Sequence, residues 1–189
     1  RQCANRSFLI DPKGQVAATY DKIHMFDVDL PGGETYRESR NYRRGDRAVT
    51  ADLPWGKLGL SVCYDLRFPQ LYRTLAKAGV SFLTIPAAFT HTTGQAHWHV
   101  LHRARAIETG CFVIAPAQGG KHENGRHTFG HSLIVDPWGN IIAEGRDYIR
   151  EAAWITLIPG LLLAMTVLGL NLLSSPSLFH PLYSLFLAR

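Results

Sequence analysis

The stretch KLGLSVCYDLRFPQLYRTLAKAG, residues 57–79, predicts a strand, a turn and a helix in direct succession. Residues 57–64 are a short apolar run followed by a polar turn, which is typical of a buried strand. Residues 70–79 carry apolar side chains at helical spacing and end in Gly79, which predicts a short helix that stops at the glycine. Cys63 therefore lies where a buried strand gives way to a turn.

Strands and helices continue to alternate on either side of this stretch. The predicted elements, in chain order, are a hairpin of residues 7–11 and 16–22, a strand in 80–89, a helix in 96–110 that ends at Gly110, a strand in 111–118, and two strands around a turn in 130–145. Alternation of this kind predicts an α/β fold in which helices are layered on a sheet.

Residues 30–47, LPGGETYRESRNYRRGDR, show neither helical nor strand periodicity. The segment is polar and rich in glycine, so we expect a long loop. A loop of this length inside a compact domain usually serves function. The segment is therefore a candidate part of a site.

Length and composition indicate a globular chain. Its 189 residues, 46% apolar and 19% charged, suffice for one ordinary domain with a core. The formal charge of +5 is spread over scattered Lys and Arg residues, so no nucleic-acid partner is expected. Three cysteines, Cys3, Cys63 and Cys111, without CxxC spacing argue against a disulfide framework and a zinc site. A reducing, cytoplasmic compartment is expected for the core.

Cys63 has two interpretations on the residues alone. A buried cysteine is more often inert packing than a nucleophile. A thiol becomes a nucleophile when a neighbour lowers its pKa or takes its proton, and a strand end followed by a turn can present it. The backbone N–H of Tyr64 would then face a developing oxyanion. Lys22, between aromatic and apolar neighbours in YDKIHMFD, is either an ordinary solvated amine or the cationic partner of such a thiol.

The histidines of the predicted helix do not have the spacing of a zinc site. His91, His97, His99 and His102 lie close in sequence, but HWHVLH lacks the HExxH pattern and a nearby carboxylate ligand. We therefore expect no metal. A serine hydrolase is equally disfavoured, because no Gly-x-Ser-x-Gly motif is present.

The remaining polar residues near the motifs are assigned structural roles. Asp65 and Arg67 are expected to pair and fix the turn after the nucleophile candidate. Glu108 is expected to pair with Arg103 or Arg105, and Cys111 at a strand start is expected in the core.

Five motifs together resemble the nitrilase superfamily of carbon–nitrogen hydrolases, closest to its deaminated glutathione amidase and omega-amidase branches. They are Lys22 in YDKIHMFDVDLPG, Glu38 in YRES, Cys63 in VCYDLRFP, the segment TTGQAHWHVLHRARAIE, and GHSLIVDPWG. The resemblance covers residues 5–145. It implies a four-layer α-β-β-α sandwich, incomplete here.

The resemblance also implies a mechanism. Cys63 would be the nucleophile, Lys22 would stabilise the tetrahedral intermediate, and Glu38 would be the supporting carboxylate. The Tyr64 amide would complete the oxyanion hole. The implied substrate is a small linear amide, such as the terminal amide of a 2-oxo acid, with no metal or organic cofactor. A homodimer is a further expectation.

Two departures from the family pattern are expected to matter. The family's general-base Glu lies upstream of the lysine, and no residue before Lys22 fits its motif, so activity is expected to be impaired and the chain fragmentary or chimeric. Residues 146–189 form an apolar tail, separate from a hydrolase domain at 1–145, and 155–173 predict a membrane helix similar to one of a dipeptide transporter permease. The alternative function is that of a membrane-anchored protein in which this tail is the functional part.

Overall fold

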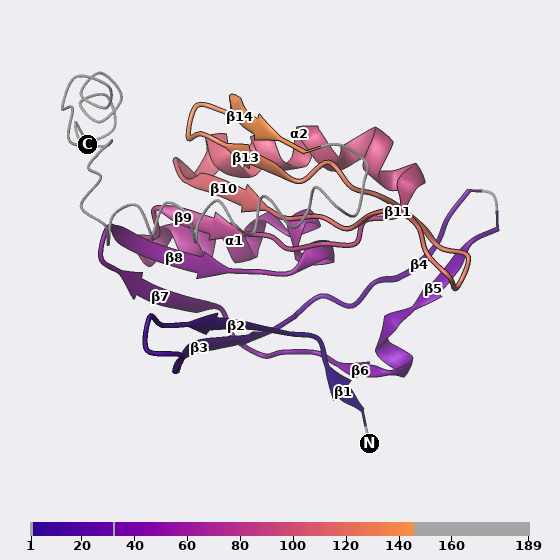
Figure 1. Cartoon of the computed structure of the whole chain (residues 1–189), viewed down its shortest axis with the longest axis horizontal. Coiled ribbons are helices and arrows are strands. Elements are labelled where there is room, and N and C mark those ends of the chain that lie inside the picture. The colour runs from indigo at the N-terminus through magenta and orange to yellow at the C-terminus, as the bar shows by residue number, and fades with distance from the viewer. Residues whose placement is uncertain (1, 32, 146–189) are drawn as a thin grey trace.

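The computed structural model describes residues 2–31 and 33–145. A six-stranded sheet forms the centre, in the order β14-β13-β10-β9-β8-β7 (Figure 1). Its strands are β7 (Val49–Leu53), β8 (Gly56–Leu60), β9 (Phe82–Thr84), β10 (Phe112–Ala115), β13 (Leu133–Val135) and β14 (Ile141–Glu144). Strands β8, β9 and β10 pair in parallel, and the outer pairings are antiparallel. The predicted α/β class is confirmed.

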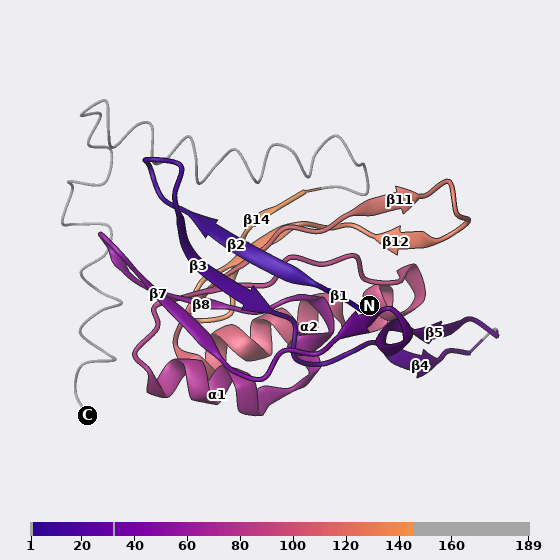
Figure 2. The same ribbon diagram turned by 90° about the horizontal axis from the view of Figure 1, so that it is seen from below.

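Two helices, α1 (Pro69–Lys77) and α2 (His91–Thr109), lie beside each other on one face of this sheet (Figure 2). Helix α1 starts with a proline, whose fixed φ suits the first helical position. Thr90 caps α2 by accepting a hydrogen bond from the Thr93 amide, and Gly110 ends the helix in a left-handed conformation. The predicted strand–turn–helix at 57–79 and both glycine stops are confirmed, although α2 begins earlier than predicted.

The core lies between helices and sheet. It contains the fully buried side chains of Leu66, Tyr72, Leu83, Trp98 and Val113, and the apolar residues of β8, β10 and β13 add to it. Along β10 and β13 buried residues alternate with half-buried ones, so one face of these strands packs into the core.

Short two-stranded pairs lie beyond one end of the sheet and alongside β7 (Figure 1). They are β2 (Arg6–Ile10) with β3 (Val16–Asp21), β4 (Asp27–Asp29) with β5 (Thr35–Arg37), β11 (Gly119–Lys121) with β12 (His127–Phe129), and β1 (Cys3–Ala4) with β6 (Tyr42–Arg43). The first of these confirms the predicted hairpin. The prediction that residues 30–47 form a loop is wrong in part, because β5, the short 3₁₀ helix η1 (Glu38–Arg40) and β6 lie within it. Pairing with β4 and β1 creates these strands, and sequence periodicity does not record such pairing.

The described residues do not form all four predicted layers. Residues 2–31 and 33–145 supply one helical layer, the main sheet, and the β2–β3 hairpin, which contacts β7. The predicted apolar helix at 155–173 lies outside the described residues, and the domain boundary after Gly145 remains a prediction. Neither α1 nor α2, the two α-helices of the described part, is long and apolar enough to cross a membrane.

Candidate active site

A pocket of about 750 Å³ brings together residues that lie far apart in the sequence. Lys22, Glu38 and Cys63 all line it. The lysine directly follows β3, the glutamate starts η1, and the cysteine starts the 3₁₀ helix η2 (Cys63–Arg67) after β8. Three of the four predicted site residues therefore meet at one cavity.

Cys63 occupies a strained backbone position. Its φ of 51° lies in the left-handed region, which non-glycine residues rarely adopt. The Cys63 amide donates to the Pro86 carbonyl at 2.9 Å, which ties the turn to the segment after β9. Such strain persists where surrounding contacts enforce it, and it clusters at functional sites. The half-buried thiol is thus held at the pocket wall, free of any disulfide.

Lys22 and Glu38, which line the same pocket, form an ion pair. The Lys22 side chain is only 2% exposed, and its Nζ donates to Oε2 of Glu38 at 2.5 Å. The Phe26 amide donates to the same oxygen at 2.7 Å, and the Asn5 side chain donates to Oε1 at 3.0 Å. Glu38 therefore accepts three hydrogen bonds, which fix it as the orienting partner of the lysine.

Opposing effects set the charge of Glu38. Burial works to raise its pKa, but the hydrogen bond and charge of Lys22, with the Phe26 amide and Asn5, outweigh burial and hold the pKa below its ordinary value. Glu38 is therefore ionised at neutral pH and neutralises the buried ammonium. A carboxylate so stabilised is a poor proton acceptor.

Cys63 is protonated at neutral pH. Burial raises the pKa of its thiol, and the charges of Glu38 and Asp65 add to this effect. The positive charge of Lys22 and a hydrogen bond from the Ala88 backbone act in the opposite direction without cancelling it. The site therefore needs a proton acceptor before the sulfur can attack.

We expect the rate of Cys63 alkylation by iodoacetamide to increase at a higher pH than the rate for a free cysteine derivative. Only the thiolate reacts, and the raised pKa delays its formation as the pH increases. Mass spectrometry of the Cys63 peptide across pH measures the profile. If Cys63 were alkylated at a lower pH than the free cysteine derivative, its thiol pKa would not be raised.

Asp65 connects the two halves of the site. It is fully buried, and its Oδ2 accepts from the Tyr20 hydroxyl at 2.7 Å and the Val62 amide at 2.9 Å. Its Oδ1 accepts from the His24 amide and from His24 Nδ1, at 3.0 and 2.7 Å. One carboxylate thus joins both flanks of the buried lysine to the residue before Cys63.

The predicted pairing of Asp65 with Arg67 is wrong. The side-chain hydrogen bonds of Asp65 go to the network just described, and Arg67 contacts His97 at 3.3 Å. The Arg67 guanidinium also lies over the rings of Tyr64 and Phe89. Adjacent opposite charges suggested a local pair, but the partners of Asp65 come from elements 41 and 45 residues away.

Tyr64 is not among the described residues that line the pocket. Its ring packs edge-on between Phe26 and Phe68, with centroids 5.0 and 5.4 Å away. This packing fixes the turn after the nucleophile candidate. The role of the Tyr64 amide as an oxyanion donor remains a prediction.

The other structural assignments are confirmed. Glu108 pairs with Arg105 at 2.8 Å, and Arg105 also donates twice to the Leu66 carbonyl, which ties α2 to η2. Cys111 is 1% exposed and belongs to the core. Arg103 instead donates to the Gly139 carbonyl.

Sequence reasoning missed Asn5 and Arg126, which also line the pocket. Arg126 comes from the turn before β12 and reaches over the Tyr36 ring, 5.5 Å from its centroid. Its Nε is buried and has no hydrogen-bond partner, and one terminal nitrogen donates to the Ala88 carbonyl at 3.3 Å. No local pattern marks these residues, because their role depends on which loops meet at the pocket.

Comparison with known proteins decides the family. Residues 2–159 match the sequence profile described as "Carbon-nitrogen hydrolase". This chain belongs to the carbon–nitrogen hydrolase family. The match extends past Gly145. The hydrolase interpretation is supported, and the membrane-protein alternative is not.

Curated relatives of this carbon–nitrogen hydrolase include a deaminated glutathione amidase from Synechocystis. It is 53% identical over 145 residues, which are 76% of this chain and 53% of the relative. The chain thus spans about half the length of the curated relatives it matches. The predicted closeness to this branch is confirmed.

Solved structures share the fold. The C. elegans NitFhit protein matches 87% of this chain and 42% of its own, with a TM-score of 0.74 and 38% identity. A mutant of the amidase from Nesterenkonia sp. AN1 matches 75% of this chain and 51% of its own, with a TM-score of 0.65 and 26% identity. That structure is described as showing covalent addition of the acetamide moiety of fluoroacetamide at the active site cysteine. The chain thus has the nitrilase-type α/β fold.

Proposed function

We propose that this carbon–nitrogen hydrolase is an amidase that uses Cys63 to convert a small linear amide to a carboxylic acid and ammonia. The observation that carries the proposal is the shared pocket. A cysteine held in a strained turn faces the same cavity as the buried Lys22–Glu38 ion pair. The covalent adduct described for the Nesterenkonia amidase supports a cysteine nucleophile.

The proposed reaction has two stages. The Cys63 sulfur attacks the amide carbon after losing its proton, and the carbonyl oxygen becomes an oxyanion near the Lys22 ammonium and the Tyr64 amide. The C–N bond then breaks as the nitrogen takes up a proton and leaves as ammonia. Water cleaves the resulting thioester, which releases the acid and restores the thiol.

Glu38 supports this reaction by orienting Lys22. Its low pKa and its three donors suit a fixed anion better than a base. Glu38 is the only carboxylate among the described residues that line the pocket. We therefore place the proton acceptor for Cys63 outside residues 2–31 and 33–145.

Arg126 lines the pocket and indicates which class of substrate could bind there. The pocket arginines Arg6 and Arg37 pair with Asp21 and Asp29, but no carboxylate of the described part pairs with Arg126. A guanidinium with a buried, unsatisfied N–H can hold a carboxylate through two parallel bonds. We propose that the substrate carries a carboxylate besides its amide, as in the terminal amide of a 2-oxo acid.

We expect Arg126→Gln to raise KM for a carboxylate-bearing amide by roughly 10- to 100-fold, because one charge-assisted contact is lost. The KM for an uncharged amide of the same length should change little. Arg37→Gln is the matched control, since Arg37 also lines the pocket but is bound to Asp29. Steady-state ammonia release measures both constants. Equal effects on charged and uncharged amides would contradict the carboxylate contact.

The proposed function is tested by ammonia release together with intact mass. The chain is incubated with short amides of 2-oxo acids, the reaction is quenched in acid, and the mass of the protein is measured by mass spectrometry. We expect ammonia and a thioester adduct on the Cys63 peptide. Absence of both, from a folded chain and across the amide series, would overturn the proposal.

A further inference from the structure

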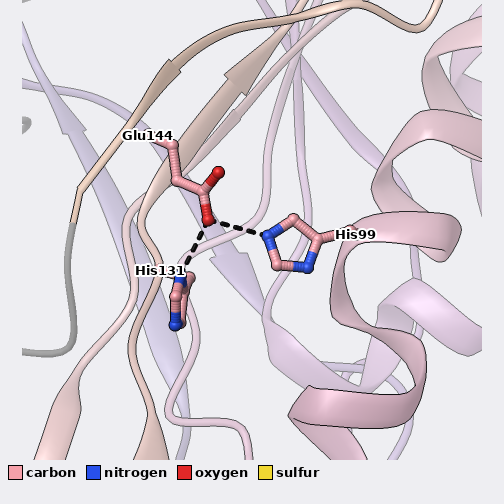
Figure 3. Close-up of side chains that lie close together, drawn as sticks. All are labelled: His99, His131 and Glu144. Atoms are coloured by element: carbon pink, nitrogen blue, oxygen red, sulfur yellow. Dashed lines mark hydrogen bonds and ion pairs between the residues drawn. The ribbon is translucent and has the colours of Figure 1, made fainter.

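We propose that His99, His131 and Glu144 form a binding site for a divalent metal ion of the zinc type, apart from the pocket that contains Cys63. The three side chains come from α2, from the connection between β12 and β13, and from the end of β14 (Figure 3). None of them lines the proposed active site. The inference therefore does not depend on the amidase proposal.

Both imidazoles converge on one point. His99 Nε2 and His131 Nδ1 lie 2.8 and 2.7 Å from the same oxygen, Oε1 of Glu144 (Figure 3). All three ligand atoms lie within 4.8 Å of one another. Zinc binds nitrogen and oxygen at about 2.0–2.1 Å, so tetrahedral ligand atoms are about 3.3 Å apart. Because Glu144 Oε1 now occupies the point where the nitrogens converge, an ion bound there requires the carboxylate to move back by roughly 1–2 Å through rotation of its partly exposed side chain.

The ligand chemistry selects the kind of ion. Two imidazoles and one carboxylate form the ligand set of many zinc sites that keep one position open to water. Imidazole nitrogen favours zinc and its first-row neighbours over Mg²⁺ and Ca²⁺, which prefer oxygen ligands. The three side chains are between 28% and 35% exposed, so an ion can enter and keep a water ligand. On binding, each imidazole carries its proton on the other ring nitrogen, and no redox step is needed.

The surroundings hold the histidines in place. His131 has a left-handed backbone, with φ of 56°, and its carbonyl accepts from the indole of Trp98 at 2.7 Å. The Phe129 ring stacks on His131 with centroids 4.3 Å apart and meets His99 edge-on at 5.9 Å. A rigid, partly apolar shell of this kind orients metal ligands before the ion arrives.

Other histidines of the described part are arranged differently. The rings of His91 and His127 stack nearly in parallel at 4.1 Å, so their in-plane lone pairs cannot meet at one ion. His102 is buried and bonded to the Trp98 carbonyl, and His97 contacts Arg67. The sequence-based expectation of no metal considered the cysteines and the helix histidines and left out His131 and Glu144, which reach His99 from other elements.

The test is titration of the folded chain with Zn²⁺ after its accessible thiols are alkylated, which removes Cys3 and Cys63 as competing ligands. Isothermal calorimetry gives stoichiometry and affinity, and thermal unfolding with and without Zn²⁺ gives a second readout. The variants are His99→Gln and Glu144→Gln. His97→Gln is the matched control, because it makes the same change two residues away on α2, outside the cluster.

We expect one Zn²⁺ per chain, a higher Tm in Zn²⁺, and little response to Mg²⁺. Each cluster variant should weaken Zn²⁺ binding by roughly tenfold or more, and His97→Gln should leave it unchanged. Co²⁺ added to the unaltered chain should give the visible absorption of a site with low coordination number, which requires no variant to fold. Undetectable binding, equal binding by the His99 variant, or only the spectrum of hydrated Co²⁺ would overturn the proposal.

Discussion

Cys63→Ala is expected to abolish amide hydrolysis, with a loss of roughly 10³-fold or more in kcat/KM. The thioester route has no substitute for the sulfur, because the other pocket residues are not nucleophiles held at the same point. Ammonia release under single-turnover conditions measures the loss. The variant should also retain substrate binding, because Arg126 remains in the pocket.

Cys3→Ala is the matched control for this experiment. Cys3 lies exposed on β1, and the same substitution there should leave turnover unchanged. If Cys63→Ala released ammonia at the unaltered rate, the cysteine would be packing and the proposed mechanism would be wrong.

Asp65→Ala is expected to lower the free energy of unfolding by about 3–5 kcal/mol. The substitution removes a fully buried carboxylate and leaves the Tyr20 hydroxyl, the Val62 amide and both donors of His24 without their acceptor. Each buried donor left unsatisfied adds a desolvation cost. Urea unfolding followed by circular dichroism measures the change.

Asp52→Ala provides the comparison for Asp65. Asp52 is highly exposed and faces Lys57 at 3.7 Å, so its loss should change the free energy of unfolding by less than about 1 kcal/mol. Similar losses for the two variants would show that the buried network contributes little. Asp65 also joins the two halves of the site. We therefore expect the Asp65→Asn variant to unfold more slowly than Asp65→Ala and to retain more amidase activity than Asp65→Ala.

The sequence predicts elements well where local signals decide them. Helices α1 and α2, with their glycine stops, and the parallel strands β8, β9 and β10 follow from periodicity and from turn residues. Strands β5 and β6 and the helix η1 lie in the polar, glycine-rich stretch 30–47 and escape prediction, because the two strands exist through pairing with β4 and β1.

The candidate site likewise contains residues that the motifs indicate and residues whose role depends on contacts between distant segments. The motif resemblance indicated Lys22, Glu38 and Cys63, and the structure places them around one pocket. It could not indicate Arg126, whose relevance comes from an unpaired N–H in a cavity made by distant loops. Asp65 was assigned to the wrong partner because its side-chain partners besides Val62 are Tyr20 and His24, which lie across the fold.

The strand order of the central sheet has a consequence for how the chain folds. Strands β8, β9 and β10 are neighbours both in the sheet and along the chain, each joined to the next through α1 or α2. Contacts of short sequence separation form at a smaller loop-closure cost. The turn with the thiol can therefore take shape early, while the β2–β3 hairpin and its lysine dock afterwards. Catalytic geometry would then be the last property that the folding chain acquires.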